Sequence, residues 1–197
     1  MIKKCITIVF LILCVLTQLF AGPFGFKMGM TLDEIADVCG GSEPKHFKNN
    51  IFYILPEKTH PLFDYYAVYV DENYGLYCIK AMSSEIKSNR YGREIQNAFT
   101  EVTDRIAKVY GKPKIIDELD PNSIYRDDDE WLYAFQDGSR ILAAVWEKSN
   151  KMPLKDNLMY VCVQASPIKS YLDEGIIVLE YTFANISAVI ASQDEVF

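Results

Sequence analysis

The sequence is poor in the side chains that most enzymes and metal proteins use. It has two histidines, His46 and His60, and neither stands close to a cysteine or to the other histidine. It contains no Cys-x-x-Cys or His-x-x-x-His pair, the usual spacings of zinc ligands, and no Gly-x-Ser-x-Gly segment, which marks the nucleophile turn of α/β hydrolases. We therefore predict no metal, no cofactor and no catalytic residue. A serine and a histidine brought together by the fold alone stay open as an alternative.

Long apolar runs are also scarce, and the one present stands at the start. Residues 5–16 are apolar except Thr7, and they follow Lys3 and Lys4. This run is shorter than the roughly 20 residues that cross a bilayer. A more polar stretch then ends at Ala21, so we predict a signal peptide over residues 1–21 and export to the periplasm or the medium. An uncleaved segment that holds the protein at the membrane is the alternative.

Basic residues are outnumbered, with 20 Lys and Arg against 27 Asp and Glu and a net charge of −7. A surface of this sign repels nucleic acids and anionic lipid headgroups. We therefore predict no nucleic-acid partner, and expect a protein, a peptide or a neutral glycan instead.

Three cysteines follow the predicted signal peptide: Cys39, Cys78 and Cys162. Each stands among apolar residues, so we expect three small buried side chains. One disulfide with one cysteine left over is the alternative, because exported proteins meet an oxidising environment.

Two helices are predicted with their boundaries. Residues 31–34, Thr-Leu-Asp-Glu, form a capping box, and the apolar residues Leu32, Ile35, Ala36 and Cys39 then follow at helical spacing up to the glycines at 40 and 41. A longer helix is predicted over residues 91–110. Phe99 and Val102 lie on its buried stripe, and Glu101 and Asp104 lie on its solvent-facing side. Gly111 and Pro113 end it.

Strand patterns fill most of the remaining chain. They cover residues 51–55, 63–70, 76–82, 131–136, 140–147, 157–165 and 175–183, and Asp137-Gly138 is predicted as a hairpin turn. The acidic residues 117–130 are predicted as a solvated connection, with a weak calcium site as the alternative. Residues 185–197 show no clear period.

The order of elements is a helix and then strands, repeated once. This order predicts an α+β fold of two layers, with the helices packed on one face of an antiparallel sheet. Residues 22–197 form one predicted domain with tandem units of about 22–85 and 86–197.

Residues 29–35, Gly-Met-Thr-Leu-Asp-Glu-Ile, resemble the Gly-Met-Thr-x-x-Glu-Val opening of a broad group of small exported bacterial proteins. That group includes the small lipoprotein subunit of the outer-membrane β-barrel assembly machine. The order of elements is also similar to each half of the β-lactamase inhibitor protein fold, in which helices pack on a small antiparallel sheet twice in tandem. The resemblance implies a binding or scaffolding module. The chain has no cysteine at its predicted mature start, unlike the lipoprotein subunit.

Aromatic residues are abundant, with 13 tyrosines and 11 phenylalanines. Strand alternation predicts that Tyr65 and Tyr69 face away from the helices, and we add Trp146 as a third candidate for a binding surface. A packed sheet that uses these rings for stability alone is the alternative. The predicted function is an exported, non-enzymatic binding or protein-interaction module of the cell envelope. An envelope or secreted hydrolase is the alternative class.

Overall fold

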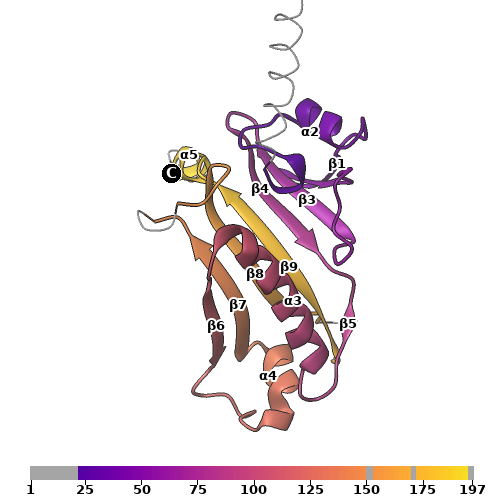
Figure 1. The fold of residues 1–197 in the computed structure, drawn as a ribbon, viewed down its shortest axis with the longest axis vertical. Coiled ribbons are helices and arrows are strands. Elements are labelled where there is room, and N and C mark those ends of the chain that lie inside the picture. Colours follow the sequence, from indigo (N-terminus) through magenta and orange to yellow (C-terminus); the bar gives the residue numbers. More distant parts are fainter. Residues whose placement is uncertain (1–21, 150–152, 170–171, 195–197) are drawn as a thin grey trace, which may run out of the picture.

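The computed structural model describes residues 22–149, 153–169 and 172–194 (Figure 1). The predicted signal peptide over residues 1–21 lies outside the described residues. Within the described ranges, no helix is long and apolar enough to cross a membrane.

An antiparallel sheet forms the centre of the molecule. Its first strands are β1 (Lys45–Lys48), β2 (Ile51–Ile54), β3 (Tyr65–Asp71), β4 (Gly75–Met82) and β5 (Ile86–Lys87). Its later strands are β6 (Lys114–Leu119), β7 (Arg140–Glu147), β8 (Leu158–Pro167) and β9 (Glu174–Phe183). The spatial order is β1-β2-β3-β4-β9-β8-β7-β6, and the short β5 pairs with β9. Two meanders of consecutive strands, β1–β4 and β6–β9, are therefore joined through their last strands, β4 and β9.

Helices supply a second layer, which confirms the predicted α+β fold. They are α2 (Leu32–Val38), α3 (Arg93–Tyr110), α4 (Trp131–Asp137) and α5 (Ile186–Asp194), with the 3-10 turns η1 (Pro23–Gly25) and η2 (Asp128–Glu130). In Figure 1, α3 lies across β8 and β9, and α4 lies at the end of β7. The exception is α5, whose Val189 packs with Tyr77 and Cys78 in a separate cluster on the other face of the sheet.

The predicted boundaries of α2 and α3 follow local sequence signals. Glu34 donates its backbone N–H to Thr31 Oγ1 at 3.3 Å, and the Glu34 carboxylate accepts the Thr31 backbone N–H at 2.8 Å. These two bonds are the capping box, and they satisfy donors that the first helical turn leaves free. Gly111 stops α3 with φ +85°, a value that favours glycine.

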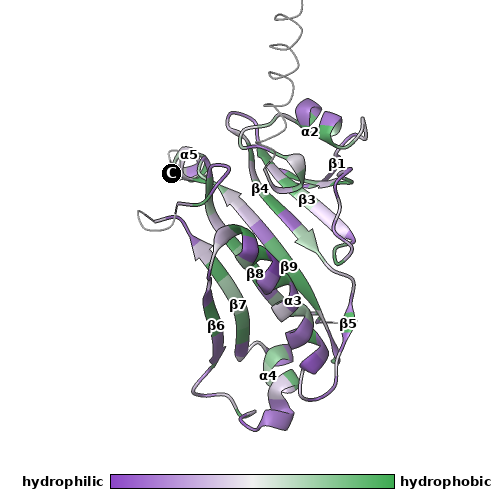
Figure 2. Ribbon diagram, viewed as in Figure 1, coloured by the Kyte–Doolittle hydropathy of each residue, from purple (hydrophilic) through white to green (hydrophobic). Residues whose placement is uncertain are grey.

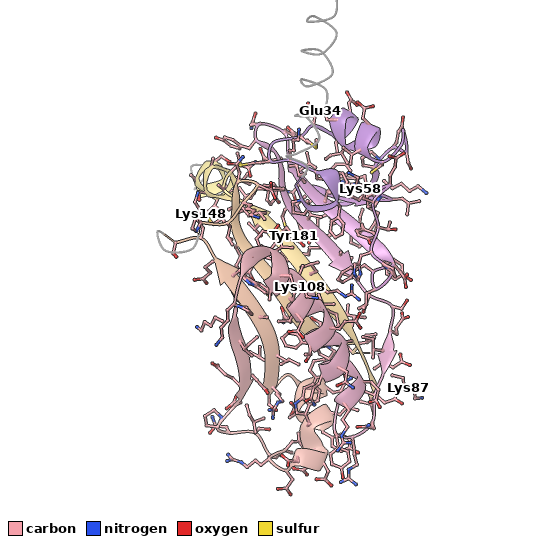
Figure 3. All side chains as sticks on the ribbon, in the orientation of Figure 1. Glu34, Lys58, Lys87, Lys108, Lys148 and Tyr181 are labelled. Carbon is pink, nitrogen blue, oxygen red and sulfur yellow. The ribbon has the colours of Figure 1, made fainter. Side chains whose placement is uncertain are left out.

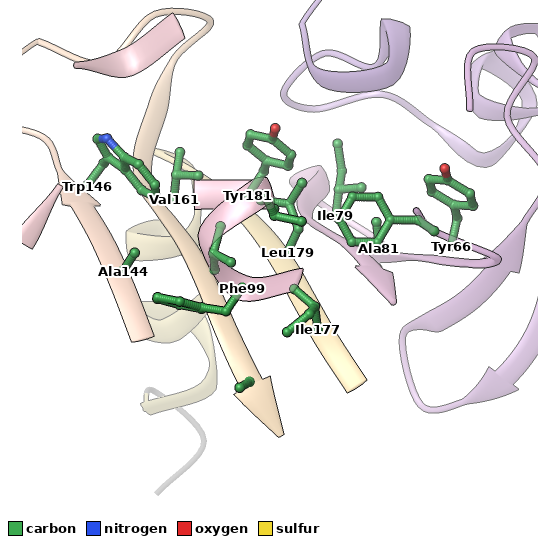
Figure 4. Close-up of a cluster of buried hydrophobic side chains, with 14 of the residues drawn as sticks. Tyr66, Ile79, Ala81, Phe99, Ala144, Trp146, Val161, Ile177, Leu179 and Tyr181 are labelled. Carbon is green, nitrogen blue, oxygen red and sulfur yellow. The ribbon is translucent and has the colours of Figure 1, made fainter. Parts of the chain in front are cut away.

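The core lies between α3 and the sheet. Phe99 is 5% exposed and packs over Ile177, Leu179 and Val161, as Figure 4 shows. Glu101 and Asp104 are exposed, so the predicted division of α3 into a buried and a wet side is confirmed. Figure 2 shows hydrophobic residues along β7, β8 and β9 beneath this helix. The same cluster continues into the first meander through Ile79, Ala81 and Tyr66.

The prediction of a strand over residues 131–136 is wrong, because these residues form α4. Trp131 and Phe135, four residues apart, stack with ring centroids 5.2 Å apart, a contact that only a helix allows at this spacing. Asp127 and Glu130 form a capping box just before α4. Gly138, with φ +84°, ends the helix rather than turning a hairpin.

Three further segments differ from the sequence prediction. Residues 114–119 form the edge strand β6, whose second half overlaps the predicted connection over residues 117–130, and Asp117 pairs with Arg140 of β7 at 2.8 Å. Residues 45–48 form the other edge strand, β1. The C-terminal stretch without a clear period contains α5.

Candidate binding face

The sheet has two unlike faces, and we call the one opposite α2, α3 and α4 the open face. Along β9, alternate residues divide between the two faces. Ile177, Leu179 and Tyr181 are buried beneath α3, while Val178 and Glu180 are half-buried on the open face. The open face is therefore the part of the sheet that is left to meet solvent or a partner.

The strand register builds continuous rows across the open face. Tyr53 of β2 stands opposite Ala67 of β3, and Ala67 stands opposite Lys80 of β4. Lys80 then stands opposite Glu180 of β9, which stands opposite Cys162 of β8. One row thus runs from the first meander into the second, with the Lys80–Glu180 pair at their junction.

An ion pair occupies the middle of this row. Lys80 Nζ lies 2.9 Å from a Glu180 carboxylate oxygen and 5.4 Å from the centre of the Tyr69 ring. Burial lowers the pKa of Lys80, but the hydrogen bond and charge of Glu180 outweigh it, and the net pKa is raised. The ammonium is therefore firmly protonated at neutral pH. Its ion pair with Glu180 links β4 to β9, the two strands at which the meanders meet.

The cysteines on either side of β9, Cys78 and Cys162, are buried. Burial raises the pKa of Cys78 to about 12 and raises the pKa of Cys162. The nucleophilic form of cysteine is the thiolate, which these thiols do not supply at neutral pH. Cys39, Cys78 and Cys162 are all buried and free, as the sequence analysis predicts.

Exposed aromatic rings gather at the β1–β3 end of the open face. The rings of Phe47 and Tyr53 have centroids 4.9 Å apart, although the side chains are 58% and 40% exposed. Tyr65 is 54% exposed and lies on β3 two residues before Ala67, the cross-strand neighbour of Tyr53. Leu55 follows β2 directly and is 65% exposed. We call Phe47, Tyr53, Leu55 and Tyr65 the aromatic corner.

The three predicted site residues do not form one surface. Tyr65 lies in the aromatic corner, while Tyr69 is half-buried beneath Lys80 and in edge contact with Tyr77 at 6.0 Å. Trp146 lies on the helix-covered face, is 0% exposed, and donates its Nε1–H to the Gly111 carbonyl at 2.6 Å. The expectation that Trp146 contributes to an exposed surface is therefore wrong. On β7 it shares a face with Leu142 and Ala144, which pack in the core.

The other members of the aromatic corner, Phe47, Tyr53 and Leu55, were not predicted as site residues. Phe47 belongs to β1, a strand of four exposed residues without the alternation that predicts a strand. Tyr53 and Leu55 stand in an apolar run before Pro56, which indicates an edge strand but not which side chains are exposed. Their association depends on the pairing of β1 with β2 and of β2 with β3.

A groove of about 440 Å³ lies beside the start of α2 and is lined by Asp33, Asp71 and Tyr74 among others. Asp71 Oδ1 accepts the backbone N–H groups of Asn73 and Tyr74 at 2.9 and 3.1 Å. This carboxylate therefore shapes the β3–β4 turn. In the described ranges no group of three or more His, Cys, Asp or Glu residues is placed to hold a metal ion.

Comparison of the chain with protein-family models, with curated proteins and with solved structures finds no match.

Proposed function

We propose that residues 22–197 form an exported, non-enzymatic interaction module of the cell envelope, which binds a protein partner through the aromatic corner. The observation that carries this proposal is the exposure of Phe47, Tyr53, Leu55 and Tyr65, each at least 40%, in one place on a sheet. Contiguous exposed apolar side chains are typical of interaction sites, and tyrosine is enriched among the residues that contribute most binding energy.

The chemistry of the aromatic corner favours a protein over a glycan. Sugars stack on aromatic rings and also need polar groups around them, whereas Leu55 adds an aliphatic side chain to the surface. The charged neighbours available on β1 are Lys45 and Lys48. The chain as a whole carries −7. The two lysines beside the rings disfavour a basic partner surface and the net charge of the chain disfavours an acidic one, so a largely neutral protein surface with apolar side chains fits this combination best.

A binding role also agrees with the state of the ionisable groups. The thiols of Cys78 and Cys162 are kept protonated, and the Glu180 carboxylate is engaged by Lys80 and by the Thr182 hydroxyl at 3.0 Å. These groups stabilise the sheet, and none is poised for proton transfer or nucleophilic attack.

We further propose that the two meanders, each preceded by a helix, correspond to the two halves of the β-lactamase inhibitor protein fold. A departure is that the first meander follows α2 alone, a helix of seven residues. By this resemblance the module would act on another exported protein.

Capture of a partner from envelope extracts, with the purified mature domain as bait, tests the proposal. The variant Phe47→Ser, Tyr53→Ser, Tyr65→Ser removes the rings, and Tyr133→Ser removes a 46% exposed ring from α4 as a matched control. We expect the triple variant to lose at least tenfold in capture of a discrete protein that the control retains. Its free energy of unfolding should fall by less than about 2 kcal/mol, because the three rings are 40–58% exposed and lose mainly one ring–ring contact.

Equal capture by the wild type, the triple variant and the control would overturn the proposal. So would partner loss that occurs only with unfolding of the triple variant, since the rings would then serve stability.

A further inference from the structure

A small pocket of about 90 Å³ lies where α3, the N-terminal turn η1 and the loop before β3 meet. Its walls are largely apolar and come from both halves of the chain, with Phe24, Phe63, Val102 and Leu179 among them. Three polar side chains, those of His60, Arg105 and Tyr181, also line it. The pocket lies on the opposite side of the sheet from the aromatic corner.

Tyr181 is a buried residue that lines this pocket. The residue is 6% exposed, and its ring packs against the rings of Phe24 and Tyr110 with centroids 5.9 and 6.3 Å away. In Figure 4 its hydroxyl points away from the strand, to the same side as the hydroxyl of Tyr66. Figure 3 places Tyr181 beside the end of α3.

The two tyrosine hydroxyls differ in their partners. Tyr66 accepts the backbone N–H of His60 at 2.9 Å. The Tyr181 hydroxyl has no hydrogen bond to any group in the described part of the chain. The Tyr181 oxygen is not among the fully enclosed polar atoms that lack a partner, so it meets the open space of the pocket, where a molecule from outside the chain can accept its hydrogen.

His60 adds a second donor. Its Nδ1 accepts the backbone N–H of Leu62 at 3.2 Å, which leaves the proton of the neutral ring on Nε2. Burial, and then the charge of Arg105, lowers the pKa of His60, so the ring is neutral at pH 7. The Arg105 guanidinium donates to Glu101 at 2.9 Å, and this carboxylate balances its charge. The pocket therefore combines apolar walls with hydrogen-bond donors, and the charge of Arg105 at its edge is already paired with Glu101.

Phe24 forms one wall in an unusual backbone conformation, with φ +56°. A left-handed backbone is strained for an L-residue, and such residues are frequent at ligand sites. Its ring is held in place by edge contacts with Tyr66 at 5.1 Å and Tyr181 at 5.9 Å.

We propose that this pocket binds a small neutral molecule with a compact apolar body and one carbonyl oxygen, which accepts a hydrogen bond from Tyr181. The chemistry favours a neutral ligand because a carboxylate would compete with Glu101 for Arg105, and an ammonium would meet the positive Arg105 and the donor of His60. The pocket volume limits the enclosed part to a few non-hydrogen atoms, in comparison with an apolar cavity of about 150 Å³ that holds benzene.

Four compounds of nearly equal size test the proposal: 2-butanone, butyramide, butyrate and butylammonium. Their binding to the mature domain is followed by ligand-observed NMR, with affinities in the millimolar range expected for so few atoms. We expect 2-butanone and butyramide to compete for one site. Butyrate and butylammonium should bind at least tenfold more weakly.

Two variants assign the site. Tyr181→Phe keeps the ring and removes the unpartnered hydroxyl, so it should fold normally and weaken butyramide binding about fivefold, the effect of one hydrogen bond of about 1 kcal/mol. Tyr110→Phe, on the neighbouring ring that does not line the pocket, should leave the affinity unchanged. Unchanged affinity in Tyr181→Phe, equal binding of the charged compounds, or the absence of saturable binding would each overturn the proposal. The aromatic corner lies on the other face of the sheet, so none of these results bears on the proposed function.

Discussion

Replacement of Trp146 by phenylalanine tests how the long helix is fixed to the sheet. The Trp146 indole is fully buried on β7 and hydrogen-bonds the carbonyl of Gly111, the residue that ends α3. The bond satisfies a helix-end carbonyl and ties the end of α3 to the second meander.

The expected cost follows from two contributions. Gly111 is exposed, so water can take the place of the indole donor, and loss of the hydrogen bond costs about 1 kcal/mol. The smaller ring also leaves space in a closely packed layer, which adds about 1–2 kcal/mol, well below the 3–5 kcal/mol of a truncation to alanine. We therefore expect Trp146→Phe to lower the free energy of unfolding by about 2–3 kcal/mol. For a domain of this size the melting temperature would fall by roughly 5–10 °C.

Urea unfolding followed by circular dichroism measures this loss. Tyr181→Phe is the control, because it removes a hydroxyl that borders a pocket and has no hydrogen bond within the described residues, so it should change the free energy of unfolding by less than about 0.5 kcal/mol. A loss below about 1 kcal/mol in Trp146→Phe, or an equal loss in both variants, would refute the role assigned to the indole.

Three further perturbations test the packing and the buried ionisable groups. Phe99→Ala should cost about 3–5 kcal/mol in urea unfolding, whereas Glu101→Ala, on the wet side of α3, should cost less than about 1 kcal/mol; similar losses would mean that the stripe is not packed. Gly92 and Gly138 have φ +69° and +84°, but a Cβ on Gly92 would collide with the Trp131 ring and one on Gly138 would meet nothing. Gly138→Ala should therefore lower stability by about 1–2 kcal/mol, and Gly92→Ala by clearly more in thermal unfolding; equal effects would contradict the contact with Trp131. Burial raises the pKa of Cys78 and of Tyr110 to about 12 each, so both stay neutral in the folded protein while the unfolded chain ionises. Stability should thus hold below about pH 9 and fall between pH 9 and 12, by at most about 1.4 kcal/mol per pH unit for each group. The fall should be shallower in Cys78→Ala, and a flat profile to pH 11 would be evidence against burial of these groups.

Elements with strong local signals could be predicted from the sequence. The capping box of Thr31 and Glu34 and the glycine after α3 depend on contacts within a few residues of the chain. They can therefore be recognised without knowledge of the fold. The strands β8 and β9 carry long β-branched and apolar runs, which predict strands in any context. The order of these elements was enough to predict the α+β class.

Short elements depended on contacts that are distant in sequence. The seven residues of α4 are rich in aromatic side chains, which favour strands in isolation. The stacking of the Trp131 ring on the Phe135 ring favours the helix instead. The edge strand β6 is half polar because it meets solvent, and its pairing with β7 spans the α4 insertion. Residue propensities include neither the ring stack in α4 nor the pairing of β6 with β7.

The candidate site depends even more on long-range pairing. Alternation separates the residues of β7 into two sets but does not say which set faces α3. It therefore could not show that Trp146 is buried. The aromatic corner requires the register of β1, β2 and β3 together. Tyr65 could be predicted as exposed, but its neighbours Phe47 and Tyr53 could not.

Site-specific photo-crosslinking in cells that export the protein tests the central claim most directly. A photoreactive phenylalanine analogue replaces Tyr53 or Tyr65 in the aromatic corner, and Tyr133 on α4 in the control. We predict that both corner positions crosslink to the same discrete envelope protein and that the α4 position does not. No crosslinked product from either corner position, or the same products from all three positions, would contradict the assignment of the aromatic corner as the binding surface.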